Sequence, residues 1–179
     1  MKNLKDIIQE RLHINKDTGN HSYNYHPKTR DELKELVDKL INERGNDADL
    51  NDINTSEITD MSALFYYSIF NGDISNWDVS KVKNMRVMFD GSSFNGDISK
   101  WDVSNVEDMY RMFAQSSFTG ENGDISNWDV SNVKNMGSMF YESEFNGDIS
   151  NWNVSNVENM YHMFLGSPLQ QNTPKWYEE

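Results

Sequence analysis

The side chains that could support catalysis or ligand binding are four histidines, many serines and 29 acidic residues, in a chain of 179 residues without cysteine. The absence of cysteine excludes thiolate zinc sites and cysteine nucleophiles. The histidines share no metal-ligand spacing, and no HExxH, GxSxG or phosphate-loop pattern occurs. The serines recur as repeat positions without a regular histidine partner. We therefore expect no enzymatic activity, no metal and no cofactor. The histidines are His13, His21, His26 and His162.

Aspartates recur at two fixed positions. The first set, here called the acidic face, comprises Asp78, Asp102, Asp129 and Asn153, and the second acidic row comprises Asp73, Asp97, Asp124 and Asp148. If Trp77 and Val79 point inward, Asp78 points outward. One interpretation is that each carboxylate accepts a backbone N–H in an Asx turn. The other is that unrelieved charge attracts a basic partner protein and repels nucleic acid. Stacked carboxylates could also share calcium, but the known calcium-loop patterns are absent.

Other positions differ from copy to copy while the apolar positions stay the same. Tyrosine and arginine, which are enriched in binding hot spots, occupy several of these variable positions. The alternative is ordinary drift of solvent-exposed residues. The candidate binding residues, here called the variable edge, are Arg86, Tyr110, Arg111, Tyr141, Tyr161 and His162.

These residues belong to an internal repeat. The segments GDISNW or GDISKW end at Trp77, Trp101, Trp128 and Trp152, which lie 24, 27 and 24 residues apart. After each tryptophan follows a D-V-S-x-V-x-x-M-x-x-M-F pattern, with Asn153 replacing the aspartate in the last copy. Large apolar residues placed once per period cannot close a core within one unit, so stacked units must share one.

Within a unit the apolar spacing changes. Ile74, Trp77 and Val79 suggest a short strand, whereas Val82, Met85, Met88 and Phe89 have the spacing of one helical turn. The Asn-Gly-Asp segment favours a tight turn, since Asn and Gly tolerate positive φ. We predict an α/β repeat solenoid, a leucine-rich-repeat-like stack of short parallel strands and short helical turns. The repeats occupy 49–179 as four to five units, with a truncated unit at 165–179.

Residues 1–48 differ in composition. They hold nine basic and nine acidic residues, so the net charge of −13 belongs entirely to the repeats. We expect helices at about 3–14 and 29–44, the second starting at a capping box of Thr29 and Glu32. Because an open solenoid end exposes apolar surface, these residues are predicted to form an N-terminal helical cap.

The unit FNGDISxWDVSxVxxMxxMF resembles that of the BspA-like leucine-rich-repeat surface proteins, which are also common in mycoplasmas. The resemblance covers about 49–176, and the segment from His26 to Ile41 is similar to the lead-in of that family. It implies extracellular adhesion or host-protein binding without catalysis, at the cell surface or after secretion. The lack of an apolar leader in Met1–Asn15 instead favours the cytoplasm for this chain.

Two functions remain open. The first is a non-enzymatic solenoid that binds another protein, one with a basic surface if the acidic face is used. The second is an intracellular acidic inhibitor that mimics nucleic acid and blocks a basic nucleic-acid-binding protein, as phage-encoded proteins do. For either we expect no direct nucleic-acid binding, no membrane span, and a monomer or weak end-to-end oligomer.

Overall fold

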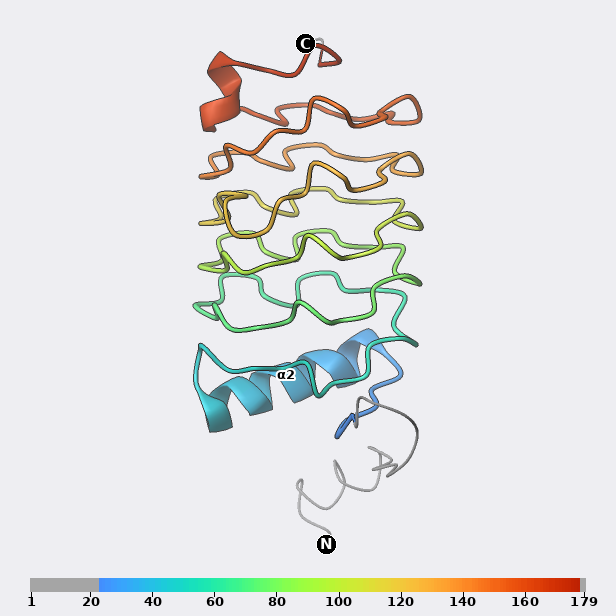
Figure 1. Cartoon of the computed structure of the whole chain (residues 1–179), viewed down its shortest axis with the longest axis vertical. Coiled ribbons are helices and arrows are strands. Elements are labelled where there is room, and N and C mark those ends of the chain that lie inside the picture. Colours follow the sequence, from blue (N-terminus) through green and yellow to red (C-terminus); the bar gives the residue numbers. More distant parts are fainter. Residues whose placement is uncertain (1–22, 178–179) are drawn as a thin grey trace, which may run out of the picture.

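The computed structural model describes residues 23–177, which form a stack of similar coils resting on one helix (Figure 1). Helix α2 spans Arg30–Arg44, and a 3₁₀ turn, η1, spans Pro168–Gln171 at the opposite end of the stack. Elsewhere the described residues adopt turns and irregular backbone. The helix expected at 3–14 lies outside the described residues.

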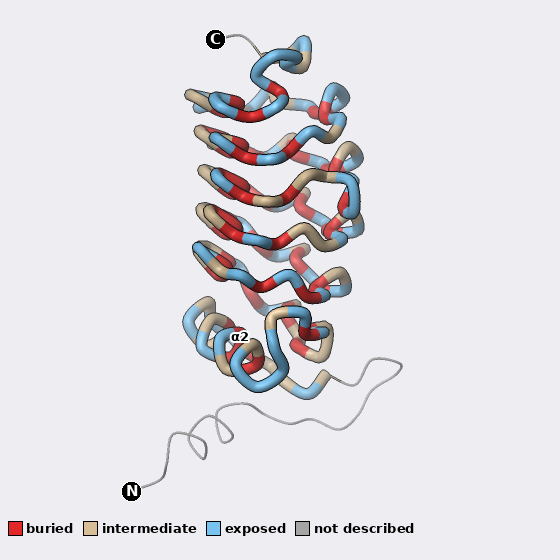
Figure 2. The backbone as a smooth tube through the Cα atoms, turned by 90° about the vertical axis from the view of Figure 1, so that its left-hand side faces the viewer, coloured by how far each residue is buried: buried red, intermediate tan, exposed pale blue. Residues whose placement is uncertain are grey.

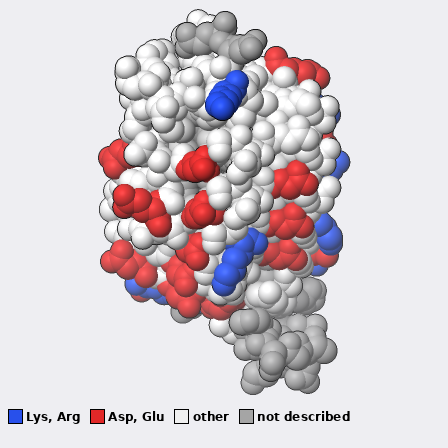
Figure 3. All heavy atoms as spheres, turned by 45° about the horizontal axis from the view of Figure 1, so that its top comes forward, with Lys and Arg blue, Asp and Glu red and all other residues white. Residues whose placement is uncertain are grey.

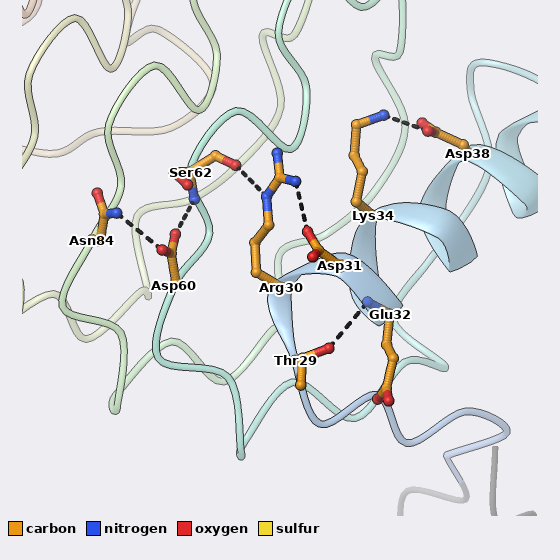
Figure 4. A network of polar contacts seen from close by, with 9 residues as sticks. All are labelled: Thr29, Arg30, Asp31, Glu32, Lys34, Asp38, Asp60, Ser62 and Asn84. Carbon is orange, nitrogen blue, oxygen red and sulfur yellow. Dashed lines mark hydrogen bonds and ion pairs between the residues drawn. The ribbon is translucent and has the colours of Figure 1, made fainter. Parts of the chain in front are cut away.

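The helix predicted at 29–44 is present as α2. The Thr29 hydroxyl oxygen accepts the Glu32 N–H at 3.2 Å, and the Glu32 carboxylate accepts the Lys28 N–H at 2.7 Å, so the first turn is capped from both sides (Figure 4). Gly45, with φ 94°, ends the helix. The buried face of α2 covers the first coil and consists of Leu33, Leu36, Val37 and Leu40.

The predicted parallel sheet is absent from the described residues. The pairings of β type between consecutive coils are isolated parallel bridges, and the segment expected to be a strand is a turn instead. The Trp77 N–H donates to the Ile74 carbonyl at 3.1 Å, which bends the chain before an extended run can form. The inward and outward alternation is nevertheless correct, because Trp77 and Val79 are buried and Asp78 is exposed. The bridges among the M-x-x-M-F segments join Asp60 to Asn84, Asn84 to Asp108, Asp108 to Asn135 and Asn135 to Asn159.

The predicted helical turn is replaced by two successive β-turns. The Met88 N–H donates to the Met85 carbonyl at 3.3 Å, and the Ser92 N–H donates to the Phe89 carbonyl at 3.1 Å. In each turn the third residue, Val87 or Gly91, has a positive φ, which no α-helix contains. The first of these left-handed positions recurs in every coil, at Ala63, Val87, Arg111, Ser138 and His162. The second recurs at Tyr67, Gly91, Gln115, Glu142 and Gly166.

The core is one continuous cluster, whose buried residues recur at the same places from coil to coil (Figure 2). Five phenylalanine rings stack from coil to coil with centroids 5.4 to 6.0 Å apart and planes within 4° of parallel: Phe65, Phe89, Phe113, Phe140 and Phe164. The tryptophan indoles lie beside them. Each indole N–H donates to a carbonyl of the preceding coil, as from Trp101 to Ile74 at 3.2 Å. The predicted shared core is therefore confirmed.

The glycine of Asn-Gly-Asp serves close packing, not the predicted positive φ. None of these four glycines has a positive φ. A Cβ on Gly72 would lie 2.1 Å from the Ala48 carbonyl oxygen of the neighbouring coil. Glycine is therefore required at Gly72 because the two backbones approach too closely for any side chain.

Candidate functional site

The residues of the acidic face are built into Asx turns. Oδ1 of Asp78 accepts the Ser80 N–H at 3.0 Å and the Ser80 hydroxyl at 2.6 Å. Asp102, Asp129 and Asn153 each accept the N–H of the serine two residues later, at 3.1, 3.0 and 3.2 Å. All four side chains are exposed. Each side chain uses one oxygen to shape the backbone, which leaves its second polar atom directed at solvent.

The second acidic row repeats this geometry. Its aspartates accept serine N–H groups at 2.9 Å. Hydrogen bonds from Ser99 lower the pKa of Asp97, and the Ser150 N–H does the same for Asp148. The pKa of Asp73 is also lowered, since hydrogen bonds from Ser75 and Asn51 outweigh the opposing effect of its partial burial. The charged form of these carboxylates is therefore the one that fits the fold.

Acidic side chains follow one another along the stack (Figure 3). No lysine or arginine of residues 23–177 forms an ion pair with an aspartate of the acidic face or of the second acidic row. Five cations of the repeats pair with other acids, namely Lys81, Lys83, Arg86, Arg111 and Lys134. Glu107, for example, is shared by Lys83 and Lys134 at 3.4 and 3.0 Å. The aspartate rows therefore form a negative surface that no ion pair compensates within this part of the chain. After the hydrogen bonds from Ser99, the charge of Lys100 is a further cause that lowers the pKa of Asp97.

On the variable edge, Arg111 forms an ion pair with Asp90 of the preceding coil. Its Nε and one terminal nitrogen donate to the two carboxylate oxygens of Asp90 at 2.6 and 3.2 Å. Asp90 is only 2% exposed, and its hydrogen bonds raise the pKa of Arg111. Removing one partner of a buried pair costs about 3–5 kcal/mol. Arg111 is thus mainly a structural residue, whose guanidinium lies 5.6 Å from the ring of Tyr141.

A chain of polar contacts crosses the same edge. The Tyr67 hydroxyl donates to Gln115, the Gln115 amide donates to Glu142 at 2.9 Å, and the Tyr141 hydroxyl donates to Glu142 at 2.8 Å. These bonds lower the pKa of Glu142, and the bond to Glu142 raises the pKa of Tyr141. Side chains from coils that are distant in sequence are therefore held in fixed positions by one another.

The remaining predicted residues form two further pairs. The Arg86 guanidinium lies 4.6 Å from the ring of Tyr110 and donates to Asp108 at 3.0 Å. The rings of Tyr161 and His162 stack at 3.6 Å, and Tyr161 is 70% exposed. The structure thus links Arg111 to Tyr141, Arg86 to Tyr110 and Tyr161 to His162, and the first two pairs adjoin because Tyr110 and Arg111 are consecutive residues.

Three exposed residues of the first coil were missed by the sequence analysis. Tyr66, Tyr67 and Ile69 are 52%, 62% and 68% exposed, and the Tyr66 and Tyr67 rings meet edge to face at 4.7 Å. The signal was present in the degenerate first copy, where Tyr66 and Tyr67 follow Phe65 as Asp90 and Gly91 follow Phe89. The low similarity of that copy to the others concealed the correspondence.

The stacked coils, the recurring turns and the aromatic ladder define a repeat protein. The family described as "Mycoplasma protein of unknown function, DUF285" matches residues 32–121 and again residues 116–178. The chain belongs to this family. The two matched segments meet near the longer interval between Trp101 and Trp128, so the family unit comprises more than one coil.

No curated protein and no solved structure matches the chain. Residues 23–177 contain no group of three or more His, Asp or Glu side chains placed to hold one metal ion. Within the same residues, no helix is both long and apolar enough to cross a bilayer.

Proposed function

We propose that this chain is a non-enzymatic protein-binding repeat domain whose contact surface is the variable edge together with Tyr66 and Tyr67. One observation carries the proposal: the residues that differ between copies are mounted on turns that are the same in every coil. Such a design changes the chemistry of a surface without changing its scaffold. Exposed tyrosines on that surface provide the apolar contact area typical of binding hot spots.

We also propose that the stack is a leucine-rich-repeat-like solenoid of the BspA-like type. The single coil per period of 24 residues and the alignment of equivalent apolar side chains support this assignment. The isolated bridges would then stand where related solenoids have a continuous sheet. If the resemblance extends to function, the ligand is a protein met at the cell surface.

The test compares partner binding by surface variants. A triple variant Tyr66→Ala, Tyr67→Ala and Tyr161→Ala removes exposed rings, and we expect it to weaken binding of a captured partner at least about thirtyfold, since hot-spot residues contribute 2 kcal/mol or more. Arg111 is left intact because its loss would disturb the fold. The matched control is Asn76→Ala, Asn127→Ala and Asn151→Ala, exposed positions away from the edge. Equal affinity of the two triple variants would reject the variable edge.

The second candidate, an acidic inhibitor that mimics nucleic acid, is supported by the negative surface of the aspartate rows. Its partner would be a protein with a basic nucleic-acid-binding cleft. The triple variant Asp78→Lys, Asp102→Lys and Asp129→Lys would then abolish binding, and affinity of the unaltered chain would fall steeply as salt rises. Binding that tolerates both changes, while failing in the tyrosine variant, would exclude this candidate.

A further inference from the structure

The backbone hydrogen bonds between coils at the M-x-x-M-F segments all point in one direction. Four adjacent columns, each of four bonds, run through the stack, and every N–H donates toward the coil that follows in sequence. In one column Phe65 donates to Met88, Phe89 to Met112, Phe113 to Met139 and Phe140 to Met163, each at 2.9 Å. The left-handed residues make this possible, because they turn alternate peptide groups to the same side. Carbonyl groups therefore end these columns near α2, and N–H groups end them at the opposite end.

The carbonyl end is closed by the chain itself. Arg30, at the start of α2, donates from Nε to the Ser62 carbonyl at 2.9 Å, and α2 lies directly beneath this coil (Figure 4, Figure 1). Buried Leu33, Val37 and Leu40 of the helix cover the apolar side of the same coil. Arg30 therefore bonds one of the four carbonyls that end the columns, and α2 fills the space in which a further coil would lie.

The N–H end is open in three of the four columns. The N–H groups of Met160, His162 and Phe164 have no hydrogen-bond partner among the described residues. In the fourth column the Gly166 N–H donates to Oε1 of Gln170 at 2.7 Å, so a side-chain carbonyl takes the place of a backbone carbonyl. Residues 23–177 thus supply one acceptor where four are needed.

The apolar side of this last coil is also incompletely covered. Val154, Val157 and Met160 are partly exposed, whereas their equivalents one coil earlier, Val130, Val133 and Met136, are at most 1% exposed. A cavity of about 560 Å³ lies at the same end, between residues 146–151 and residues 172–175. Unpaired donors, partly exposed apolar side chains and a cavity are therefore all found at this end of the stack, the cavity being lined by other residues than the donors.

We propose that this end of the stack binds an unfolded segment of a partner protein, which adds a coil of the same turns through its backbone carbonyl groups. The interior coils specify the occupant: carbonyl oxygens on alternate residues, with apolar side chains that cover Val157 and Met160. A single anion does not fit, because the equivalent N–H groups of the preceding coil bond to three different carbonyls, of Asn159, Tyr161 and Met163. This binding mode is the counterpart of strand addition at a sheet edge.

A second folded copy of the chain is a poor occupant. Two copies joined through their open ends would place N–H donors against N–H donors. Joining the open end to the other end would require the space beneath the first coil, which α2 occupies, and the Ser62 carbonyl, which Arg30 already bonds. In place of the weak end-to-end oligomer, one of the two states expected from the sequence, we therefore propose binding of a different, unfolded segment.

The test uses ¹⁵N-labelled chain and a synthetic peptide with the sequence of residues 129–145, which carries the V-x-x-M-x-x-M-F pattern. We expect saturable binding with a Kd below about 1 mM. Binding should slow hydrogen exchange at the Met160 and His162 amides and leave the amides of the matched interior residues Met136 and Ser138 unchanged. A scrambled peptide of the same composition is the control and should cause neither effect.

Two further arms make the result decisive. The variant Val157→Asp should lower peptide affinity at least about tenfold, whereas Ser155→Asp, a neighbouring exposed position, should not. Unchanged exchange at Met160 and His162 under saturating peptide would overturn the proposal, as would equal protection of these amides by inorganic phosphate alone. Concentration-dependent dimers of the unliganded chain would equally contradict it, because they would show that a second copy fills the site. None of these outcomes bears on the tyrosine variants, so this proposal and the proposed function fail separately.

Discussion

Single residues of this protein tolerate backbone conformations that usually require glycine. Ala63, Val87 and Ser138 have φ of 55°, 60° and 54° at the same position of successive coils. The left-handed region costs a non-glycine residue about 1–2 kcal/mol. Hydrogen bonds offset this strain, because the N–H of each of these residues donates to a carbonyl of the next coil, at 3.0, 2.9 and 2.9 Å.

We predict that Ser138→Gly stabilises the protein by up to about 1 kcal/mol, because glycine adopts the left-handed conformation without strain. The matched control is Ser131→Gly, at a position without positive φ, where added freedom of the unfolded chain should cost about 0.5–1 kcal/mol. Urea unfolding of both variants measures the difference. If both variants changed the free energy of unfolding in the same direction, strain at Ser138 would not explain the effect.

The aspartates of the Asx turns predict a dependence of stability on pH. The pKa values of Asp73, Asp97, Asp129 and Asp148 are lowered from the ordinary value of 3.8. Their contribution is therefore complete above about pH 3.8 and is lost as the pH falls through the lower pKa values of the folded state. We expect the melting temperature to hold at neutral pH and to drop in acid.

The variant Asp97→Asn tests the cause of that drop. Asparagine accepts the same N–H without a charge, as Asn153 does from Ser155 at 3.2 Å. We expect the variant to melt near the unaltered protein at pH 7 and to lose less stability at acid pH. Thermal melts at several pH values give the comparison. An acid sensitivity identical to that of the unaltered protein would mean that Asp97 does not contribute.

At the scale of elements, α2 is the regular structure that closes the stack. Its apolar residues replace the side chains that a preceding coil would supply, and Arg30 replaces a backbone donor. The helix therefore serves both the hydrophobic and the hydrogen-bonding needs of the first coil. No corresponding helix covers the other end within the described residues, where η1 supplies only Gln170.

We predict that Thr29→Ala destabilises the protein by about 1 kcal/mol through loss of the N-cap, while Thr29→Ser has little effect because its hydroxyl can accept the same N–H. Both variants are compared by urea unfolding followed by circular dichroism. If the serine variant lost as much stability as the alanine variant, packing of the Thr29 methyl group, and not capping, would explain the loss.

At the scale of the whole molecule, stability is shared between neighbouring coils. Each interior phenylalanine of the main ladder packs against the ring before it and the ring after it, and the indole N–H groups donate to the preceding coil across the same boundaries. Such an array behaves as a chain of units coupled to their neighbours. A defect in the middle should therefore interrupt cooperativity, whereas a defect at the end should not.

We predict that Phe113→Ala lowers the free energy of unfolding by about 3–5 kcal/mol and divides unfolding into two steps. The matched change at the end of the ladder, Phe164→Ala, should cost less and leave a single transition. Tryptophan fluorescence and circular dichroism during urea unfolding should separate for Phe113→Ala only. Coincident curves and equal losses for both variants would show that the coils unfold as one unit.

The sequence alone determined the period, the shared core and the inward or outward direction of each side chain, because these follow from where large apolar residues recur. Trp77 buried beside exposed Asp78 is such a case. Only the tertiary structure decided the local conformation. Met88 and Phe89 follow Met85 by three and four residues, a spacing that fits either a helix or two successive turns. The backbone hydrogen bonds between neighbouring coils favour the turns. The same bonds give the columns their direction, and folding pairs Arg111 with Asp90, 21 residues away. These pairings depend on which coils become neighbours, which no local pattern encodes.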